Sequence, residues 1–563
     1  MSMNSAGRGG DQSVRGPWCE AMRSPGRPMI YYRSVVLFGR MCGAGHHTGT
    51  PSWSTPAAPP KPGRSAVRAL STPRSTTEQE CRPMSTRRPT LIPPLRRLTT
   101  VGTAAIAGLA LAVGTIATPA HAADPVPTTD AEAERLNDER AAEDPAELDR
   151  SSVPAGVSVE QARSVVESSD EITVADVEYA AAVEDLPASG VPADFYDTPA
   201  TLPEENGAVV RQAESDFYLD PVRLIRHNAK TTTFMYRTTD DRGTARAATA
   251  TLLSPANSQG PAQDAVVIAP GTQGTADKCA PSRQLSMGTE YEGIGVTSAL
   301  AADRPVIVVD YIGLGTEGPH RYLNRVEEGR AVLDAARAVQ QVEGSGIDAK
   351  TQLQLRGYSQ GGQATAAALE LAAEWAPELN LASASAGAVP TDLNDAVGRL
   401  SGVYTGFLLF GADSFAEQAG IDLDDHLNEK GQETVERAAG QCTVEAVLTN
   451  AFVDTSTLTK NGGDFQQLVE EEFAAVLDEQ RLGMTAIPDV PVLVNHSRLD
   501  DVVPFAQGRG LAAAWCDAGR SVTFADNLAP THIGGYLASL PRVEAFTSTT
   551  FAGQSPLNSC WRL

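Results

Sequence analysis

The feature that most constrains the fold is a serine flanked by glycines, placed between an apolar run and an alanine-rich segment. Residues 352–356 (QLQLR) favour a strand, and residues 363–375 favour a helix. The residues GYSQG at 357–361 leave room only for a sharp turn between them. Glycines two positions before and after Ser359 let neighbouring backbone approach without meeting a Cβ. A strand–turn–helix unit of this kind is typical of parallel sheets covered by helices.

The rest of the chain continues this alternation. Short apolar or β-branched runs that favour strands occur at residues 247–253, 265–269, 305–310, 381–389, 491–496 and 521–525. Residues 326–342 carry apolar side chains at helical spacing. Short buried strands that alternate with helices predict an α/β fold, with a mostly parallel sheet and helices on both faces.

One region breaks the alternation. Residues 391–486 contain no convincing strand and favour several helices. Because this region lies between two predicted core strands, we interpret it as a helical cap or lid domain inserted into the sheet domain. The two parts of the sheet domain would then be residues 191–390 and 487–563.

The N-terminal part is typical of a targeting signal. Residues 84–122 begin with Met84, carry four arginines, continue in an apolar run at 101–117 and end in Ala-His-Ala. This pattern predicts a secretory signal peptide cleaved after Ala122, because the 17-residue run is short for a membrane span. Residues 1–83 precede it; the simplest interpretation is that translation starts at Met84, and a disordered extension is the alternative.

Charge is distributed unevenly. Residues 1–122 hold 15 Lys or Arg and 4 Asp or Glu, whereas the remainder holds 30 and 66. A body this acidic would repel phosphate backbones, which argues against a nucleic-acid partner and is consistent with simple solubility. Residues 123–190 are acidic and poor in aromatic side chains, so we expect a disordered linker there. No later run favours stable membrane insertion, and nothing predicts the oligomeric state.

The exported part contains an even number of cysteines: Cys279, Cys442, Cys516 and Cys560. In an exported protein this number indicates two disulfides, and the residues alone leave three pairings open. A metal site is the alternative, but no C-x-x-C or clustered Cys/His spacing is present. We therefore expect no metal.

The serine in the turn is a candidate nucleophile. A serine hydroxyl needs a base, and in strand–turn–helix sites of this kind the partners follow in the order Ser, acid, His. Three histidines follow Ser359, namely His426, His496 and His532. His426 lies among acidic residues in the predicted cap, and His496 precedes any acid in a usable loop. Chain order therefore favours His532, which we expect in a loop after the last strand.

The acid should follow a core strand. The strand predicted at 491–496 leads into a loop that contains Asp500 and Asp501, and either could hold the imidazole in the correct tautomer. Spacing alone does not separate these two adjacent residues. Asp526 is a weaker candidate because it lies too close to His532 in the sequence.

A tetrahedral intermediate also needs two backbone N–H donors. One would come from Gln360, the residue after the nucleophile. The glycine-containing loop at 269–274 (APGTQG) fits the second, although a simple turn is the alternative. Chemistry of this type needs no metal or cofactor.

These residues and their surroundings resemble the secretory lipase family, the Candida antarctica lipase A-like enzymes. The matching stretches agree in order and spacing over about residues 190–563. They are PGTQG at 270–274, KCAPS at 278–282, DYIGLGT at 310–316, GRAVLDAARA at 329–338, GYSQGG at 357–362, DDVVP at 500–504 and THIGG at 531–535. The acidic linker at 123–190 has no counterpart in this pattern.

The resemblance implies an α/β-hydrolase with a helical lid that hydrolyses acylglycerols and other carboxylic esters. It places the catalytic aspartate at Asp500, leaves Asp501 in a variable position where substitution should matter little, and places the second oxyanion donor at Gln273. It also implies two disulfide pairs, Cys279–Cys442 and Cys516–Cys560.

The sequence therefore predicts a secreted lipase or carboxylesterase that acts on a lipid ester, including at an oil–water interface. Ser359 would attack, His532 would transfer the proton, and Asp500 would orient His532. The alternatives are a short-chain carboxylesterase, a secreted serine peptidase of the same fold, and a non-catalytic surface protein on a hydrolase fold.

Overall fold

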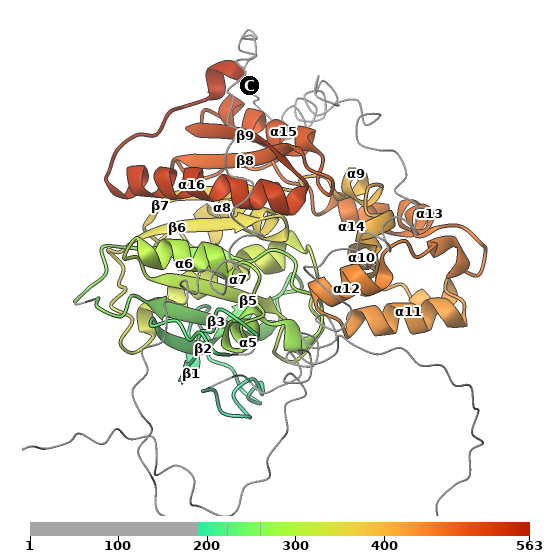
Figure 1. Cartoon of the computed structure of the whole chain (residues 1–563), viewed down its shortest axis with the longest axis horizontal. Helices are drawn as coiled ribbons and strands as arrows, with labels where there is room; N and C mark the ends of the chain where they lie inside the picture. Colours follow the sequence, from blue (N-terminus) through green and yellow to red (C-terminus); the bar gives the residue numbers. More distant parts are fainter. Residues whose placement is uncertain (1–187, 189, 222, 259) are drawn as a thin grey trace, which may run out of the picture. The chain divides into compact units, whose positions relative to one another are not determined.

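A computed structural model describes residues 188, 190–221, 223–258 and 260–563 (Figure 1). The predicted N-terminal extension, the signal peptide and nearly all of the acidic linker lie outside these residues. The described part is a single sheet covered by helices, with a further group of helices beside it.

The sheet has nine strands in the order β1-β2-β3-β5-β4-β6-β7-β8-β9. Pairing is antiparallel from β1 to β5 and parallel from β5 through β9. The predicted α/β class with a mostly parallel sheet is confirmed, and the strands β1 and β2 were not anticipated. The strands are β1 (Val209–Ser215), β2 (Lys230–Thr239), β3 (Ala245–Ser254), β4 (Asp264–Ala269), β5 (Val306–Ile312), β6 (Gln352–Tyr358), β7 (Leu381–Gly387), β8 (Val492–Leu499) and β9 (Val522–Pro530).

Helices cover both faces because side chains of the buried strands alternate between two apolar clusters. On β4, Val267 packs with α7, α8 and α15, whereas its neighbours Val266 and Ile268 face the cluster that includes α6. Helix α16 packs on the same side as α6. The helices around the sheet are α5 (Pro281–Met287), α6 (Gly293–Ala301), α7 (Arg325–Ala338), α8 (Gln360–Trp375), α15 (Phe505–Asp517) and α16 (His532–Phe551).

A buried carboxyl group on β5 joins two of the sequence motifs. Asp310 accepts hydrogen bonds from the Thr249 hydroxyl at 2.5 Å and from the backbone N–H of Ser282 at 2.8 Å. Burial raises the pKa of Asp310 to about 6, although these hydrogen bonds oppose the shift. Asp310 thus connects β3, β5 and the start of α5, and fixes the chain that follows β4.

Between β7 and β8 lies the helical segment, residues 391–486, all of which the structure describes; it forms helices and no strand of the sheet. It has an apolar cluster of its own, with Phe410, Phe415, Phe465 and Phe473 fully buried. Its role as a lid domain stays a prediction. Its helices are α9 (Leu393–Val397), α10 (Thr405–Ala419), α11 (Glu429–Ala439), α12 (Thr443–Asn450), α13 (Phe465–Leu468) and α14 (Ala474–Asp478).

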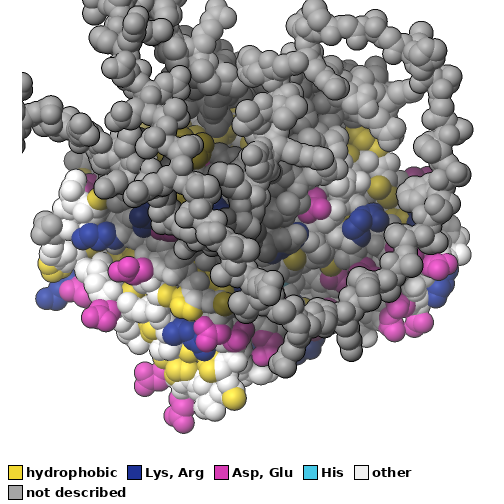
Figure 2. All heavy atoms as spheres, turned by 60° about the horizontal axis from the view of Figure 1, so that its bottom comes forward, with side chains coloured by type: hydrophobic (Ala, Val, Ile, Leu, Met, Phe, Trp, Pro, Cys, Tyr) yellow, Lys and Arg dark blue, Asp and Glu magenta, His cyan; other side chains and the backbone are white. Residues whose placement is uncertain are grey.

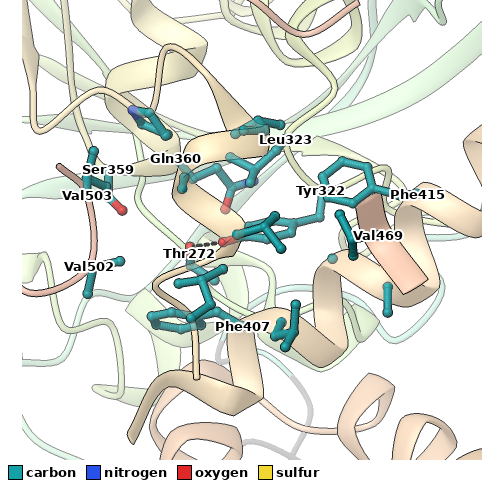
Figure 3. Close-up of a pocket in the computed structure, with 18 residues that line it drawn as sticks. Thr272, Tyr322, Leu323, Ser359, Gln360, Phe407, Phe415, Val469, Val502 and Val503 are labelled. Atoms are coloured by element: carbon teal, nitrogen blue, oxygen red, sulfur yellow. Dashed lines mark hydrogen bonds between the residues drawn. The ribbon is translucent and has the colours of Figure 1, made fainter. Parts of the chain in front are cut away.

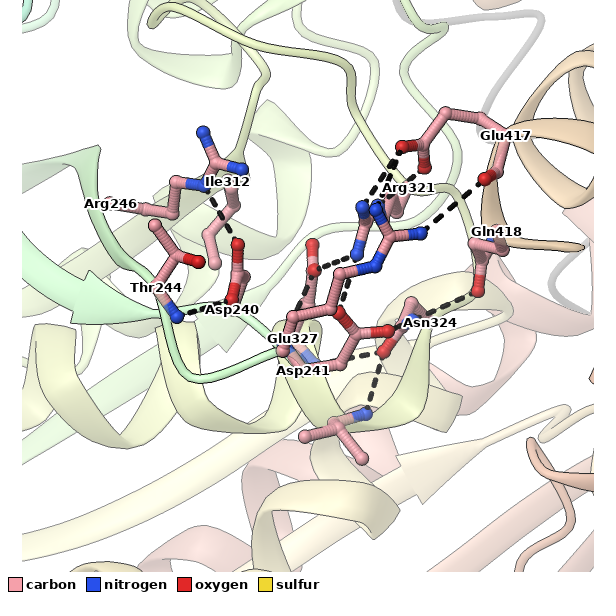
Figure 4. Close-up of polar contacts among 12 residues, drawn as sticks. Asp240, Asp241, Thr244, Arg246, Ile312, Arg321, Asn324, Glu327, Glu417 and Gln418 are labelled. Atoms are coloured by element: carbon pink, nitrogen blue, oxygen red, sulfur yellow. Dashed lines mark hydrogen bonds and ion pairs between the residues drawn. The ribbon is translucent and has the colours of Figure 1, made fainter. Parts of the chain in front are cut away.

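A buried ion pair attaches the helical segment to the core (Figure 4). Arg321 is only 4% exposed, and its guanidinium donates to both carboxylate oxygens of Glu417 on α10, at 2.5 and 2.9 Å. The same guanidinium donates to Glu327 at the start of α7, at 2.8 Å. Because a bidentate pair fixes both position and orientation, this contact holds α10 against the core.

Two disulfides close the fold, in the pairing that the resemblance implies. Cys279 is bonded to Cys442, which joins the chain after β4 to the residue before α12. Cys516 is bonded to Cys560, which joins α15 to the C-terminal residues.

The surface visible in Figure 2 carries acidic side chains interspersed with Lys and Arg, so its described part presents no field of a single sign. Within the described ranges, the structure has no helix that combines the length and apolarity needed to span a membrane.

Replacing Cys516 and Cys560 together by serine should lower the free energy of unfolding by about 2–4 kcal/mol, because the bond closes a long loop in the unfolded chain. Urea unfolding of the variant and the wild type under non-reducing conditions measures the difference. Peptide mapping of the unreduced protein checks the pairing, and a bond between Cys279 and Cys516 would contradict it.

Candidate active site

The glycine-flanked serine occupies a strained turn, as the sequence predicts. Strand β6 ends at Tyr358, helix α8 begins at Gln360, and Ser359 between them has φ 60° and ψ −125°. Residues other than glycine rarely adopt this backbone conformation, and holding a residue in it costs of the order of 1–3 kcal/mol. The backbone N–H of Ser359 donates to the Gly387 carbonyl on β7 at 2.9 Å, which helps to hold the turn.

Three glycines are required here by close approach of backbone. A Cβ at Gly361 would overlap the carbonyl oxygen of Ala269, and one at Gly362 would overlap that of Gly387. A Cβ at Gly357 would overlap the carbonyl oxygen of Gly361 itself. Any larger residue would therefore push the turn away from β4 and β7.

The structure brings Asp500 and His532 together. The Asp500 Oδ2 atom lies 2.7 Å from His532 Nδ1, and its Oδ1 accepts the backbone N–H groups of Val502 and Val503, each at 2.9 Å. Burial alone would raise the pKa of Asp500, but the charge of His532 and hydrogen bonds from His496 and His532 hold it well below its usual value. Asp500 is therefore an anion that fixes the imidazole.

His532 is the first residue of helix α16, whereas a loop was predicted there. The two glycines that follow it suggest a loop, but Thr531 caps the helix by accepting the N–H of Gly534. The hydroxyl of Tyr358 donates to the His532 carbonyl at 3.0 Å, and the two rings lie 5.0 Å apart. The helix start thus holds the imidazole beside Tyr358, the last residue of β6.

The two ring nitrogens of His532 have different surroundings. Because Nδ1 faces a carboxylate, Nδ1 carries the proton and Nε2 presents a lone pair. Nε2 is buried and has no hydrogen-bond partner within the described residues, so Ser359 and His532 are not hydrogen-bonded in this structure. Contacts of this type commonly tighten only when substrate is bound.

A second histidine lies behind the acid, and sequence reasoning did not find this role. His496 is fully buried, with Nε2 3.5 Å from Asp500 Oδ2 and 3.1 Å from the carbonyl oxygen of Val503. Because a carbonyl only accepts, Nε2 of His496 carries a proton. His496 can therefore support Asp500, and its position at a strand end four residues earlier is the one signal in the sequence.

Two of the weaker sequence candidates have other partners. His426 is half-buried in the helical segment, where its carbonyl accepts from Lys460. Asp526 is ion-paired with Arg498 at 2.6 Å.

The predicted oxyanion loop, residues 270–274, lies beside the turn. Pro270 accepts a hydrogen bond from the Tyr311 hydroxyl at 2.7 Å, and Thr272 lines the cavity together with Ser359 and Gln360. Gln273 is buried, and its side-chain amide points to Glu290 at 3.3 Å rather than into the cavity. Gln360 is the first residue of α8, where N–H groups have no partner within the helix.

The helical segment holds the oxyanion loop from the other side. Thr443 donates through its hydroxyl to the Thr272 carbonyl at 2.5 Å and through its backbone N–H to the Gln273 carbonyl at 2.9 Å. The preceding residue, Cys442, carries the disulfide to Cys279. The disulfide thus helps to fix the loop in place, whereas no sequence pattern indicates the two Thr443 contacts.

A buried polar group supports Gln360 from behind. Its side-chain amide donates to Glu328 at 2.7 Å and to His320 at 3.1 Å. Burial raises the pKa of Glu328 to about 8 and lowers the pKa of His320 to about 4, so both are neutral at pH 7. Gln360 is therefore held without placing a charge behind the turn.

An apolar cavity opens at Ser359 and extends into the helical segment (Figure 3). Its empty volume is about 600 Å³, which includes its open mouth. In the close-up, Phe415 and Val469 lie at one end, Ser359 and Val503 lie at the other, and Phe407 lies below Thr272. The helical segment contributes most of the apolar wall, including Leu393, Val397, Leu400, Phe407, Phe415 and Val469.

Comparison with known proteins agrees with this geometry. Residues 280–559 match the family model described as secretory lipase. The chain is 28% identical over 390 residues to lipase A of Moesziomyces aphidis, covering 65% of this chain and 81% of that protein. It is 26% identical to a secreted triacylglycerol lipase of Malassezia globosa, covering 65% and 80%. It is also 29% identical to a probable inactive lipase of Mycobacterium tuberculosis, covering 64% and 82%.

Solved structures show the same fold. The structure of Candida antarctica lipase A is similar with a TM-score of 0.56 and 25% identity, covering 66% of this chain and 89% of that one. A rice cell wall degrading esterase from Xanthomonas oryzae is similar with a TM-score of 0.51 at 17% identity, covering 62% and 100%. The matched residues 280–559 contain the Ser359 turn, Asp500 and His532, and over this range the chain is similar to the secretory lipase family.

Proposed function

We propose that this protein is a secreted carboxylic ester hydrolase, a lipase that uses Ser359, His532 and Asp500. The observation that carries the proposal is the strained Ser359 at the mouth of an apolar cavity, beside a histidine whose Nδ1 is bonded to a buried aspartate. The match of residues 280–559 to the secretory lipase family supports ester hydrolysis as the reaction class.

The chemistry follows from the two ring nitrogens of His532. Nε2 removes the proton of Ser359 as Oγ attacks the ester carbonyl carbon, and Asp500 stabilises the imidazolium that forms. His532 then gives this proton to the leaving alcohol as the ester C–O bond breaks, which leaves an acyl-enzyme. Water attacks the acyl-enzyme with His532 as base, and Ser359 is regenerated.

Negative charge on the carbonyl oxygen needs donors that are already in place. The backbone N–H groups of Gln360 and Gln273 are the proposed donors, and the N-terminus of α8 adds a favourable dipole. Thr443 and the buried Glu328 support these two residues in the ground state, so little reorganisation is needed during the reaction.

The cavity suggests the substrate class. Its walls are mostly apolar, as expected for an acyl chain, and each methylene removed from water contributes about 0.8 kcal/mol. Part of this free energy can position the ester carbonyl. We therefore propose acylglycerols and related esters with medium or longer acyl chains as substrates.

Secretion and contact with lipid are part of the proposal. The predicted signal peptide at 84–122 and two disulfides are in keeping with an oxidising extracellular compartment. Val403 and Ile533, the neighbours of Tyr404 and His532, are 41% and 52% exposed. Apolar side chains of this kind beside the site would favour an oil–water interface.

Two alternatives use the same residues. A serine peptidase that recognises a free amino terminus would need acidic groups for it, but Glu290 and Glu292 near the oxyanion loop bind Gln273 and the Gly271 N–H instead. A non-catalytic protein is the second alternative, and one relative is named a probable inactive lipase. Labelling of Ser359 by a fluorophosphonate distinguishes a catalytically active site from an inactive one.

Ser359→Ala and His532→Ala should each lower kcat by at least about a thousandfold, because the three residues act as one unit. Asp500→Asn should lose a similar amount or less. Turnover of a nitrophenyl ester measures these losses, and circular dichroism checks that each variant is folded. A Ser359→Ala protein with wild-type turnover would exclude the proposed nucleophile.

Turnover should rise from acetate to medium-chain esters, and emulsified triglycerides should be hydrolysed. The reason is that longer chains fill the apolar cavity, and part of the free energy of this binding positions the ester carbonyl for attack. An acyl-chain series on purified protein, with an aminoacyl anilide as the amide control, measures this preference. An enzyme fastest on acetate and inert on tributyrin would be a short-chain esterase.

Glu328→Gln should flatten the pH dependence of stability. Glu328 ionises near 4.5 in the unfolded chain but at about 8 when folded. Between these values the folded state holds the extra proton, so its stabilising effect is lost as the pH rises. Urea unfolding at several values from about pH 5 to pH 8 measures the slope, and Glu374→Gln on the exposed face of α8 is the control. Equal slopes for wild type and Glu328→Gln would contradict the shift.

A further inference from the structure

Asp501, the position that the family pattern leaves variable, has two defined partners. Its Oδ1 accepts the backbone N–H of His532 at 2.8 Å, and its Oδ2 accepts the hydroxyl of Tyr404 at 2.7 Å. The neighbouring Asp500 holds the ring of the same histidine. Two adjacent carboxylates thus hold one residue, one by its imidazole and the other by its backbone.

The backbone contact matters because His532 begins a helix. The N–H of His532 lies at the start of α16, where N–H groups lack partners within the helix and a negative charge is favourable. Thr531, just before it, has φ 65°, a backbone region that side chains rarely adopt. Asp501 therefore supplies a partner where the chain makes a strained entry into α16.

Tyr404 brings the helical segment into this contact. It lies directly before α10, and its ring stacks on Phe407 with centroids 5.9 Å apart and planes 12° apart. Phe407 lines the apolar cavity (Figure 3). Burial and the charge of Asp501 raise the pKa of Tyr404, so its phenol stays neutral and donates. Tyr404 thus contacts the cavity wall through its ring and the helix of His532 through its hydroxyl.

We propose that Tyr404 and Asp501 are positioning residues for His532, a latch through which the helical segment sets the place of the catalytic base. The inference rests on the proposed function of Ser359, His532 and Asp500. Neither latch residue is assigned a contact with substrate, and both act through the backbone of His532. This role for Asp501 replaces the expectation that its substitution has little effect on turnover.

Tyr404→Phe is the sharpest test, because it removes the hydroxyl and keeps the ring on Phe407. For a nitrophenyl octanoate, kcat should fall about tenfold, a small loss for a charge-assisted hydrogen bond because the contact is partly open to water. KM should change by less than about twofold, since an interaction that acts only on the reacting geometry lowers kcat.

Asp501 variants test the second half of the latch. Asp501→Ala should lower kcat at least as much as Tyr404→Phe, and Asp501→Asn should recover part of the loss because its amide oxygen can still accept the His532 N–H. The double variant Tyr404→Phe, Asp501→Ala should be no worse than Asp501→Ala alone, since both remove one linked contact. Losses that multiply would overturn the proposal.

Two controls separate the latch from the cavity wall. Phe407→Leu changes the wall and keeps the hydroxyl, so it should raise KM for octanoate. Tyr218→Phe removes a tyrosine hydroxyl from the segment before β2 and should change neither constant. If Tyr404→Phe behaved as Phe407→Leu does, with only KM affected, the tyrosine would be part of the wall and the proposal would be wrong.

Hydrogen exchange gives a readout that does not depend on turnover. The amide of His532 should exchange faster in Tyr404→Phe and Asp501→Ala than in the wild type, and unchanged exchange would overturn the latch. A wild-type protein that fails to react with a fluorophosphonate would refute the proposed function. A reactive wild type whose Tyr404→Phe variant keeps full kcat would refute only the latch.

Discussion

The close approach of three backbone segments at Ser359 is the constraint on which the rest of the site depends. The left-handed backbone of Ser359 is unfavourable by itself, and it persists because Gly361 packs on the Ala269 carbonyl and Gly362 on that of Gly387. The same contact brings the end of β4, and with it the proposed oxyanion loop, next to Ser359. Strain in one residue and proximity of the donors therefore have a common cause.

The surroundings of Asp500 show how a buried carboxylate can stay ionised. Asp500 has no exposed side-chain surface, yet its pKa lies well below its usual value, because the charge of His532 and hydrogen bonds from His496 and His532 outweigh the effect of burial. Two backbone N–H groups also donate to it. An anion satisfied in this way costs little further desolvation when substrate excludes water. Its negative charge can then stabilise the imidazolium of His532 during the proposed reaction.

Local patterns predicted the parts of the fold that are local in origin. The Ser359 unit has its turn and helix within about ten residues, and the buried β5 is a continuous β-branched run. Strands β1 and β2 were missed because they pair antiparallel at one edge of the sheet and carry many polar side chains. The start of α16 was missed because two glycines follow His532.

Contacts between distant segments could not be predicted from the chain. Tyr404 meets Asp501, and Thr443 meets the oxyanion loop, only because the helical segment packs on the core. His496 was set aside as a base because of its place in the chain order, and only the structure shows it beside Asp500. Chain order identifies His532 without any information on how the segments pack. The residues that hold His532 in place can be recognised only from that packing.

The Cys279–Cys442 bond also makes one side of the cavity wall stiffer than the other. Near the oxyanion loop the wall is covalently tied to the core, and the loop is further held by Thr443. Near Asp501 the Tyr404 end of the wall is held by a hydrogen bond that is partly open to water. The first edge acts as a fixed support and the second as a compliant one. In the proposed lipase, a bulky acyl chain would then be accommodated by movement of one side of the cavity, while the proposed oxyanion donors on the other side keep their geometry.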